Sequence, residues 1–199
     1  GVRAMARRHA IVRRLPAIET LGSVSVICSD KTGTLTRNEM VATAVAAAGQ
    51  LYEVDGDGYA PEGTVSRGQS AVLASEHPVL LEAARIMALC NDAALHQSSD
   101  GWRAEGDPME AALLALAGKL SGEGARPFAD WTRTDAIPFD AAHRYMAVLV
   151  HDHEGRARID VKGAPEAVLA LCADQLGADG HPAALDTGHP LLLVVDAAV

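Results

Sequence analysis

The run DKTGTLT at residues 30–36 brings together groups that could take part in phosphoryl transfer. Asp30 follows an apolar stretch, residues 24–28, that is typical of a short buried strand, and open α/β sheets bind ligands just beyond such strand ends. A carboxylate can attack a phosphoryl group once Mg²⁺ neutralises the charge between them. Lys31 adds a cation, Thr32 adds a hydroxyl and a carbonyl, and Gly33 lets the backbone approach phosphate oxygens. Asp, Thr and Gly are also ordinary turn residues, so a lone Asp-Lys would indicate only a polar turn. The complete run has no common structural explanation.

Four further strings contain side chains suited to a nucleotide: ALCNDA at 88–93, GDPME at 106–110, PFD with HRYM at 138–146, and VKGAPE at 161–166. Each alone has a simple structural explanation, such as a helix cap, a strand-edge aromatic or a glycine turn before a proline-initiated helix. Together they can form one site. Phe139 offers a flat face for adenine, and Lys162 and Arg144 can neutralise phosphates. Gly163 lets a base approach the backbone, and Glu110 can accept a hydrogen bond from an exocyclic amine.

The elements that must position these groups follow from local signals. Apolar, β-rich runs predict strands. The residues Ser, Glu and Pro near positions 75–78 predict the start of a helix, and Asp-Pro at 107–108 predicts the start of another. Gly- and Asp-rich stretches predict turns. We expect strands at 41–48, 50–54, 145–150 and 157–161, the last two joined by a hairpin turn at 151–155, and helices from 75 to about 96, from 107 to about 116 and from 164 to about 172. Residues 60–68, 98–106 and 118–127 are expected to be irregular.

Charge and composition limit the function further. A net charge of −9 excludes a general nucleic-acid binder, although five arginines crowd the first 14 residues. That basic stretch could be an arm that contacts nucleic acid, a solvated helix face or a juxtamembrane stalk, and its position just upstream of Asp30 favours the stalk. The chain has no run of the ~20 apolar residues that a membrane-spanning helix needs. Three widely spaced cysteines without a Cys-x-x-Cys indicate reduced thiols in a cytosolic setting.

In this order, DKTGTLT, ALCNDA, GDPxE, PFD and KGAPE resemble the nucleotide-binding region of type II, calcium-pump-like P-type ATPases. The stretch IVRRLPAIETLG at 11–22 is similar to the link that follows the fourth transmembrane helix in that branch. The resemblance covers almost everything from residue 1 to residue 172. It implies an ion-translocating ATPase that uses ATP and Mg²⁺ and forms an aspartyl-phosphate on Asp30. The RRLP link and the KGAPE context favour Ca²⁺ as the transported cation.

The resemblance also implies a role for each site residue. Asp30 would be phosphorylated, with Lys31 and Thr32 beside it, and Asp30 and Thr32 would hold Mg²⁺. The nucleotide pocket would be lined by Glu110, Phe139, Arg144, Lys162 and Gly163. Two departures weaken the match: Met109 stands where these pumps often carry Thr, and Ala141 stands where some carry Arg. Two polar contacts to the nucleotide are therefore expected to be missing.

The implied fold is of the α/β (α+β) class. Residues 41–199 would form the nucleotide-binding domain, a mixed, largely antiparallel sheet flanked by helices, with an atypical or truncated C-terminal part because the resemblance fades after residue 172. Residues 16–40 would supply the first strand and loop of a haloacid-dehalogenase-like phosphorylation domain, and residues 1–15 a juxtamembrane stalk segment. The expected partners are ATP and the transmembrane and actuator domains of the same pump, at the cytoplasmic face of a membrane. The transported cation would bind elsewhere, and no nucleic acid is expected.

Two alternatives belong to other functional classes. A haloacid-dehalogenase-like phosphatase also uses an aspartate nucleophile, but it usually has a second Asp two residues further on, where this chain has Thr32. A catalytically incomplete nucleotide-binding module or truncated remnant is the second alternative, because the chain ends before the family's TGD motif, phosphate-site lysine and GDGxND motif. The isolated chain is therefore expected to bind ATP without turning it over.

Overall fold

The computed structural model describes residue 7, residue 9, residues 22–30 and residues 39–186. The chain divides into two compact units, Gly1–Arg37 and Asn38–Val199. In the first unit, the strand expected at 24–28 is not formed, and Ile27 is 88% exposed. A strand requires a hydrogen-bonded neighbour, and all the described ladders lie between Ala44 and Ala184. The haloacid-dehalogenase-like fragment therefore remains a prediction.

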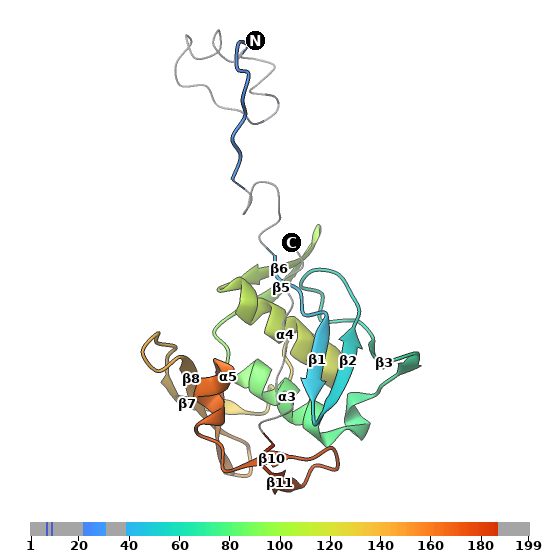
Figure 1. The fold of residues 1–199 in the computed structure, drawn as a ribbon, viewed down its shortest axis with the longest axis vertical. Helices are drawn as coiled ribbons and strands as arrows, with labels where there is room; N and C mark the ends of the chain where they lie inside the picture. The colour runs from blue at the N-terminus through green and yellow to red at the C-terminus, as the bar shows by residue number, and fades with distance from the viewer. Residues whose placement is uncertain (1–6, 8, 10–21, 31–38, 187–199) are drawn as a thin grey trace. The chain divides into compact units, whose positions relative to one another are not determined.

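All helices and strands of the described residues lie in the second unit (Figure 1). In chain order they are β1 (Ala44–Ala47), β2 (Gln50–Val54), β3 (Val65–Arg67), β4 (Ser70–Ala71), the 3₁₀ helix η1 (Ala74–Glu76), α3 (Pro78–Leu89), β5 (Ala94–Ser98), β6 (Gly101–Glu105), α4 (Pro108–Ser121), β7 (Thr132–Ile137), β8 (Tyr145–His151), β9 (Ala157–Gly163), α5 (Pro165–Leu169), β10 (Asp174–Leu176) and β11 (Pro182–Ala184). The strands form antiparallel sheets in the orders β1-β2-β3-β4, β5-β6, β7-β8-β9 and β10-β11.

The first sheet packs its apolar face against the two long helices. A two-residue turn, Ala48-Gly49, joins β1 to β2 with both φ angles positive, at 48° and 72°, as in the primed turns that suit tight hairpins. The core is formed by alternating apolar residues of β1 and β2, one stripe of α3 (Leu80, Ala84 and Met87) and one stripe of α4 (Leu113, Leu116, Ala117 and Leu120). These helical spacings place each stripe on one face.

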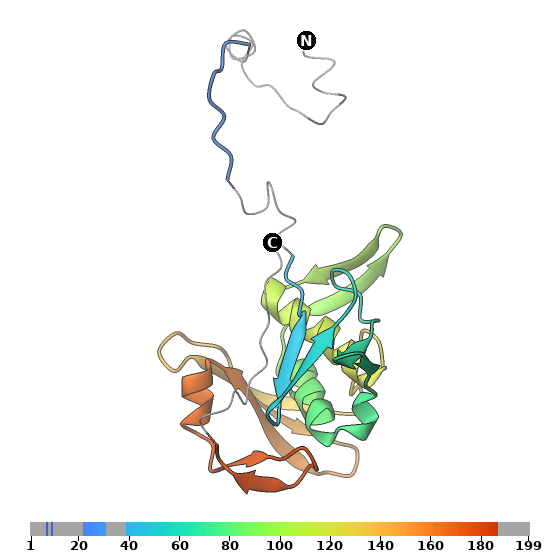
Figure 2. The same cartoon turned by 45° about the vertical axis from the view of Figure 1, so that its right-hand side comes forward.

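A second face of α3 packs against the sheet β7-β8-β9. Met146, Val148 and Val150 alternate along β8 and point to one side of that sheet, where they form a cluster with Cys90 just after α3. Ile86 and Leu89 of α3 pack against this cluster. Helix α3 therefore lies between the two sheets, and both views of the fold agree with this arrangement (Figure 2).

Helix α4 is buried along most of its length and also supports the β5-β6 hairpin. Leu95 of β5 packs against Ala111, Leu114 and Ala115 of α4. The helix begins with an Asp107 cap and Pro108 in the first turn, and it ends at Gly122, whose φ of 73° is left-handed, as at many helix C-termini. This start fixes the position of Glu110 in the first turn.

The expected mixed fold, with antiparallel sheets and a few helices, is confirmed, but several boundaries were wrong. Helix α3 ends at Leu89 rather than near residue 96, because Asn91 and Asp92 leave the helix and Ala94–Ser98 pairs with Gly101–Glu105. That hairpin replaces the loop expected at 98–106. Strands β3, β4, β7, β10 and β11 were also not expected. Within the described residues, no helix combines the length and apolarity that crossing a membrane requires.

Candidate functional site

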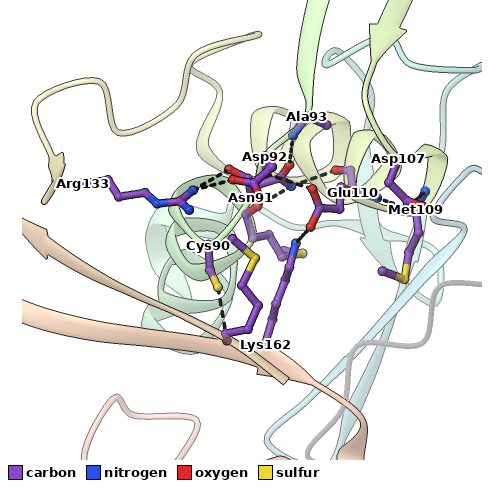
Figure 3. Close-up of polar contacts among 11 residues, drawn as sticks. Cys90, Asn91, Asp92, Ala93, Asp107, Met109, Glu110, Arg133 and Lys162 are labelled. Atoms are coloured by element: carbon purple, nitrogen blue, oxygen red, sulfur yellow. Dashed lines mark hydrogen bonds and ion pairs between the residues drawn. The ribbon is translucent and has the colours of Figure 1, made fainter. Parts of the chain in front are cut away.

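An ion pair between Glu110 and Lys162 joins the start of α4 to the end of β9 (Figure 3). Lys162 Nζ lies 2.5 Å from Glu110 Oε1, and the two side chains are only 15% and 13% exposed. Asp107 sets the position of Glu110, because its Oδ1 accepts hydrogen bonds from the backbone N–H groups of Met109 at 2.9 Å and Glu110 at 3.2 Å. Lys162 is opposite Met146 in the β8-β9 ladder, so its side chain starts on the sheet face covered by α3.

The second carboxylate oxygen of Glu110 is also held. Oε2 accepts a hydrogen bond from the backbone N–H of Asp92 at 2.9 Å. The neighbouring Asn91 side chain donates from Nδ2 to the backbone oxygens of Met87 at 2.9 Å and Glu110 at 2.8 Å. Its Oδ1 accepts from the backbone N–H of Ala93 at 2.8 Å. Residues 91–93 therefore form a fixed loop that contacts both the main chain and the side chain of Glu110.

Arg133 of β7 approaches the same loop from the neighbouring sheet. Its Nη1 donates to Asp92 Oδ1 at 2.6 Å and lies 3.5 Å from the backbone oxygen of Asn91. Figure 3 shows Arg133 on one side of the Asn91–Asp92 loop and Glu110 on the other. The loop is thus attached to α3, α4 and β7 by polar contacts.

A neutral thiol lies beneath this group of charges. Cys90 is fully buried, and its Sγ donates to the backbone oxygen of Met146 at 3.5 Å. Burial raises the pKa of the Cys90 thiol to about 11, although the positive charge of Lys162 acts in the opposite direction. Cys90 therefore contributes packing rather than charge at neutral pH.

Strand register places the remaining predicted pocket residues at one end of the sheet β7-β8-β9. Ile137 of β7 is opposite Ala147 of β8, which is opposite Val161 of β9. The end of β7, the start of β8 and the end of β9 consequently share one edge. Phe139 lies two residues beyond β7 and is 61% exposed, so its ring is available for contact.

Arg144 and Gly163 meet at that same edge. The backbone oxygen of Arg144 accepts from the N–H of Ala164 at 2.9 Å, and the backbone N–H of Arg144 donates to Asp140 at 2.7 Å. A Cβ on Gly163 would lie 2.4 Å from the Arg144 oxygen and 2.6 Å from the Tyr145 Cα. Glycine is therefore required by close packing of β9 against the start of β8. A close approach by the ligand, the reason that the sequence suggested for a glycine here, stays a prediction.

The residues expected to form the phosphorylation loop belong to a different unit from the residues expected to line the nucleotide pocket. Asp30 is exposed and belongs to the first unit, and Lys31 and Thr32 lie outside the described residues. Among the residues that the structure describes, no group of three or more His, Cys, Asp or Glu side chains is arranged to hold a metal ion. Mg²⁺ needs only one or two protein carboxylates when phosphate oxygens complete its coordination, so a site built on Asp30 and Thr32 fits the residue types.

A surface hollow elsewhere in the fold contains none of the predicted site residues. It lies at the start of β9 rather than at its end and is lined by Pro78, Leu81, Glu82, Arg158, Leu176 and Gly180. The polar groups that match the sequence prediction therefore do not coincide with this hollow. The residues predicted to line a nucleotide pocket lie instead toward the opposite end of the sheet β7-β8-β9, where Lys162 directly precedes Gly163 in β9.

Comparison with known families identifies the domain. A family model described as P-type ATPase, cytoplasmic domain N, matches residues 80–189, which is more than half of the chain. The matched range contains Glu110, Phe139, Arg144 and Lys162. The chain belongs to the P-type ATPases. The family assignment drawn from the ordered strings is thereby confirmed.

Relatives of this P-type ATPase chain are named for cation transport. The cation-transporting ATPase pma1 of Synechocystis sp. is 45% identical over 194 residues, covering 95% of this chain and 21% of the relative. The calcium-transporting ATPase of Bacillus subtilis is 37% identical, covering 92% of this chain and 20% of the relative. The calcium-transporting ATPase 2, endoplasmic reticulum-type, of Arabidopsis thaliana is 36% identical, covering 94% and 20%. The chain therefore spans about a fifth of the length of these relatives.

Four polar residues of the candidate site in this P-type ATPase chain received no role from the sequence. Asn91 and Asp92 lie in the quoted ALCNDA string but were expected inside a helix, and neither was given an individual role. Arg133 lies in the unpredicted strand β7. Glu166 belongs to KGAPE, and its carboxylate pairs with the Arg144 guanidinium. The low helix propensity of Asn and Asp was the available signal that α3 ends before residue 91.

Proposed function

We propose that this chain is the nucleotide-binding portion, with the attached phosphorylation loop, of a Ca²⁺-transporting P-type ATPase on the cytoplasmic face of a membrane. Family membership and the names of the relatives support cation transport. The choice of Ca²⁺ rests on the RRLP and KGAPE strings and on relatives named calcium-transporting ATPases. The transmembrane and actuator domains of the same pump would be its partners.

The observation that carries the ATP-binding proposal is the Glu110–Lys162 pair at the base of the sheet edge. The carboxylate presents hydrogen-bond acceptors, and the ammonium presents further donors. An adenine base has the matching donor on its exocyclic amine and an acceptor beside it. Phe139 would stack on the base, and Arg144 would neutralise part of the phosphate charge.

Phosphoryl transfer would take place on Asp30. A carboxylate oxygen of Asp30 would form a bond to the γ-phosphorus while the bond from that phosphorus to the β-γ bridging oxygen breaks, releasing ADP. The ionised carboxylate needs no proton transfer, and Lys31 would offset charge near the attacking oxygen. Mg²⁺ held by Asp30 and Thr32 would neutralise charge on the transferring group. Water would later hydrolyse the aspartyl-phosphate in the intact pump.

An NMR titration of the 199-residue chain with ATP tests the pocket. We expect weak binding that does not depend on Mg²⁺, with amide shifts at Phe139, Arg144, Lys162 and Gly163. Phe139→Ala should weaken binding by roughly 1–3 kcal/mol through lost stacking. Ile159→Ala is the matched control, because Ile159 is an exposed apolar residue of β9. It lies three residues before Lys162, so its side chain points to the opposite face of the sheet. Shifts that cluster instead at residues 151–154 would overturn the pocket assignment.

A separate experiment tests the chemistry at Asp30. We expect no stable phosphoryl-Asp30 in this chain alone, because losing even one electrostatic partner at such a site costs about a hundredfold or more. The 199 residues contain neither a TGD string nor a GDGxND string. The measurement is incubation with γ-labelled ATP and Mg²⁺, acid quenching and assay for hydroxylamine-labile label. Label on the wild type that disappears in Asp30→Asn would contradict the expected inactivity.

A further inference from the structure

We infer that Asn91, together with the Arg133–Asp92 ion pair, positions the Glu110 carboxylate and so sets the preference of the site for adenine over guanine. This inference rests on the proposed nucleotide-binding function. Neither Asn91 nor Arg133 is expected to touch the nucleotide. Each acts through Glu110, by way of the loop that holds its carboxylate.

The Glu110 carboxylate is anchored at both oxygens. Oε1 pairs with Lys162 Nζ at 2.5 Å, and Oε2 accepts from the Asp92 backbone N–H at 2.9 Å. A glutamate side chain has three rotatable bonds, so one anchor would leave the carboxylate free to rotate around the ammonium. Two anchors fix its plane. The remaining lone pairs then have a defined direction.

The second anchor depends on the loop conformation rather than on the Asp92 side chain. The Asp92 N–H reaches Oε2 because Asn91 holds the loop through three hydrogen bonds of 2.8–2.9 Å, to the backbone groups of Met87, Glu110 and Ala93. One of these bonds ends on the backbone oxygen of Glu110 itself. Two consecutive residues of the loop, Asn91 and Asp92, therefore form hydrogen bonds with the main chain and the side chain of the same glutamate (Figure 3).

Arg133 supplies the attachment to the sheet that carries Phe139. Its guanidinium donates to Asp92 Oδ1 at 2.6 Å. Arg133 lies in β7, and Phe139 follows the end of that strand by two residues. The pair is partly exposed, and such pairs contribute only about 0–1 kcal/mol to stability. The Arg133–Asp92 pair instead keeps the loop, and therefore the Glu110 carboxylate, at a fixed position relative to the Phe139 ring.

Fixed orientation matters because adenine and guanine differ in the groups at this edge. Adenine presents an amine donor at the position where guanine presents a carbonyl acceptor. A fixed carboxylate accepts from the adenine amine and repels the guanine oxygen, and a site built for a hydrogen bond rejects an analogue that leaves its polar groups unpaired. A carboxylate that can rotate would let Lys162 face the guanine oxygen instead. Loosening the anchor should therefore weaken ATP binding more than GTP binding.

The experiment measures dissociation constants for ATP and for GTP on the full 199-residue chain by NMR or calorimetry. Asn91→Asp keeps the shape and the acceptor for Ala93 but removes the two donated bonds. We expect ATP binding to weaken about tenfold, a loss equal to about 1.4 kcal/mol, while GTP binding changes about twofold or less. Gln97→Glu adds the same charge at an exposed position of β5 and serves as the matched control.

Arg133→Gln should reduce the ATP preference in the same direction but by less, and Arg133→Lys should restore part of it. Arg103→Gln is the control for that series, since Arg103 forms an exposed ion pair with Asp100 away from the loop. If circular dichroism shows that Asn91→Asp does not fold, the ratio of the ATP and GTP dissociation constants in the Arg133 variants tests the inference. A merely structural role would lower the melting temperature while leaving the ratio of the two dissociation constants unchanged.

The outcomes separate the inference from the proposed function. Wild-type chain that fails to bind ATP at Lys162 and Phe139 would overturn the proposed function, and the inference with it. Wild-type chain that binds ATP and GTP equally would overturn the inference alone. An unchanged ratio in both Asn91→Asp and Arg133→Gln would do the same. Support requires a reduced ratio in these variants with the two control variants at the wild-type ratio.

Discussion

The Arg144 guanidinium donates a hydrogen bond to the Glu166 carboxylate, so the cation at the edge of the sheet is already paired. Both side chains are at least half exposed, and the pair therefore adds little to stability. In the proposed site, however, Glu166 competes with the phosphates of the nucleotide for Arg144. The first turn of α5 thus limits the positive charge that the pocket offers.

Replacing Glu166 with Gln should tighten ATP binding, because Arg144 would be released to the phosphates. We expect about a two- to tenfold lower dissociation constant at low salt, and a smaller gain at high salt because exposed charges are screened. The measurement is calorimetric titration of the chain with ATP at two salt concentrations. Glu154→Gln is the control, since Glu154 pairs with Arg156 at the opposite end of β8 and β9. Unchanged or weaker binding in Glu166→Gln would argue against a phosphate contact by Arg144.

Cys90 should make stability depend on pH in the alkaline range. Burial raises the pKa of its thiol to about 11 from the ordinary 9.0. Between these values the unfolded chain loses the proton while the folded chain retains it, so the stabilising contribution is complete below pH 9 and lost as pH rises through 11. The loss should be about 2–3 kcal/mol, measured by urea unfolding. The difference between wild type and Cys90→Ala isolates it from other alkaline titrations.

The pH effect of Lys119 has the opposite sign, which makes that comparison necessary. Burial lowers the pKa of Lys119, although Asp55 and Asp57 act to raise it. The unfolded chain then binds more protons than the folded chain below pH 10.5, so this residue makes stability rise with pH. A Cys90→Ala chain that loses stability as steeply as wild type between pH 9 and 11 would show that the thiol is not responsible.

Asp152 should stabilise the β8-β9 hairpin above acidic pH. Partial burial acts to raise the pKa of the Asp152 carboxyl. Hydrogen bonds from the side chain and backbone of Arg156 and from the backbone of Glu154 outweigh this effect. The pKa is therefore lowered below the ordinary 3.8. This contribution is present above pH 3.8 and lost as pH falls through the folded-state pKa. Asp152→Ala should therefore be less stable than wild type at pH 7 and should converge with it in acid. Glu154→Ala, which keeps the Asp152 bonds, is the control in urea unfolding, and parallel curves for Asp152→Ala and wild type would contradict this.

Sequence predicted the elements whose signals are local. Asp107, Pro108 and Glu110 lie within one turn, so they mark the start of α4 without any tertiary contact. The β8-β9 hairpin likewise follows from two β-rich runs around a Gly-containing turn. Strand β7 could not be predicted in this way, because its residues TRTDAI are mostly exposed and do not alternate between apolar and polar. Its pairing with β8 depends on the tertiary fold.

The grouping of the candidate site residues was suggested by their chemical types and by resemblance, and sequence spacing gave no support for it because their contacts are long-range. Glu110 and Lys162 are separated by 52 residues, and no spacing rule connects them. The buried ion pair between Arg85 and Asp160 spans 75 residues and was not predicted at all. Arg85 in an amphipathic helix and Asp160 in a strand would each be expected at the surface. Only the packing of α3 against β9 explains their burial.

That buried pair gives the last prediction, which concerns the support of the strand that carries Lys162. Arg85 Nη1 lies 3.0 Å and 3.1 Å from the two carboxylate oxygens of Asp160, and the side chains are 5% and 2% exposed. Arg85 also donates to Glu82 at 2.6 Å, and its guanidinium lies 5.4 Å from the centre of the Trp131 ring. The Nε of Arg85 has no hydrogen-bond partner among the residues that the structure describes, so the loss of a further partner would leave more of this buried guanidinium unsatisfied.

Asp160→Asn should destabilise the chain strongly, because it leaves a buried guanidinium facing a neutral amide. Removing one partner of a buried pair costs about 3–5 kcal/mol, and the remaining contact with Glu82 favours the lower end of that range. Asp100→Asn, which breaks the exposed pair with Arg103, should cost about 0–1 kcal/mol. Urea unfolding at pH 7 measures both. The double variant Arg85→Met with Asp160→Leu should recover most of the loss, since apolar residues of similar volume often replace buried ion pairs without cost. A loss below about 1 kcal/mol in Asp160→Asn would mean that water or a rearranged Glu82 compensates the charge, and that this pair does not hold β9 against α3.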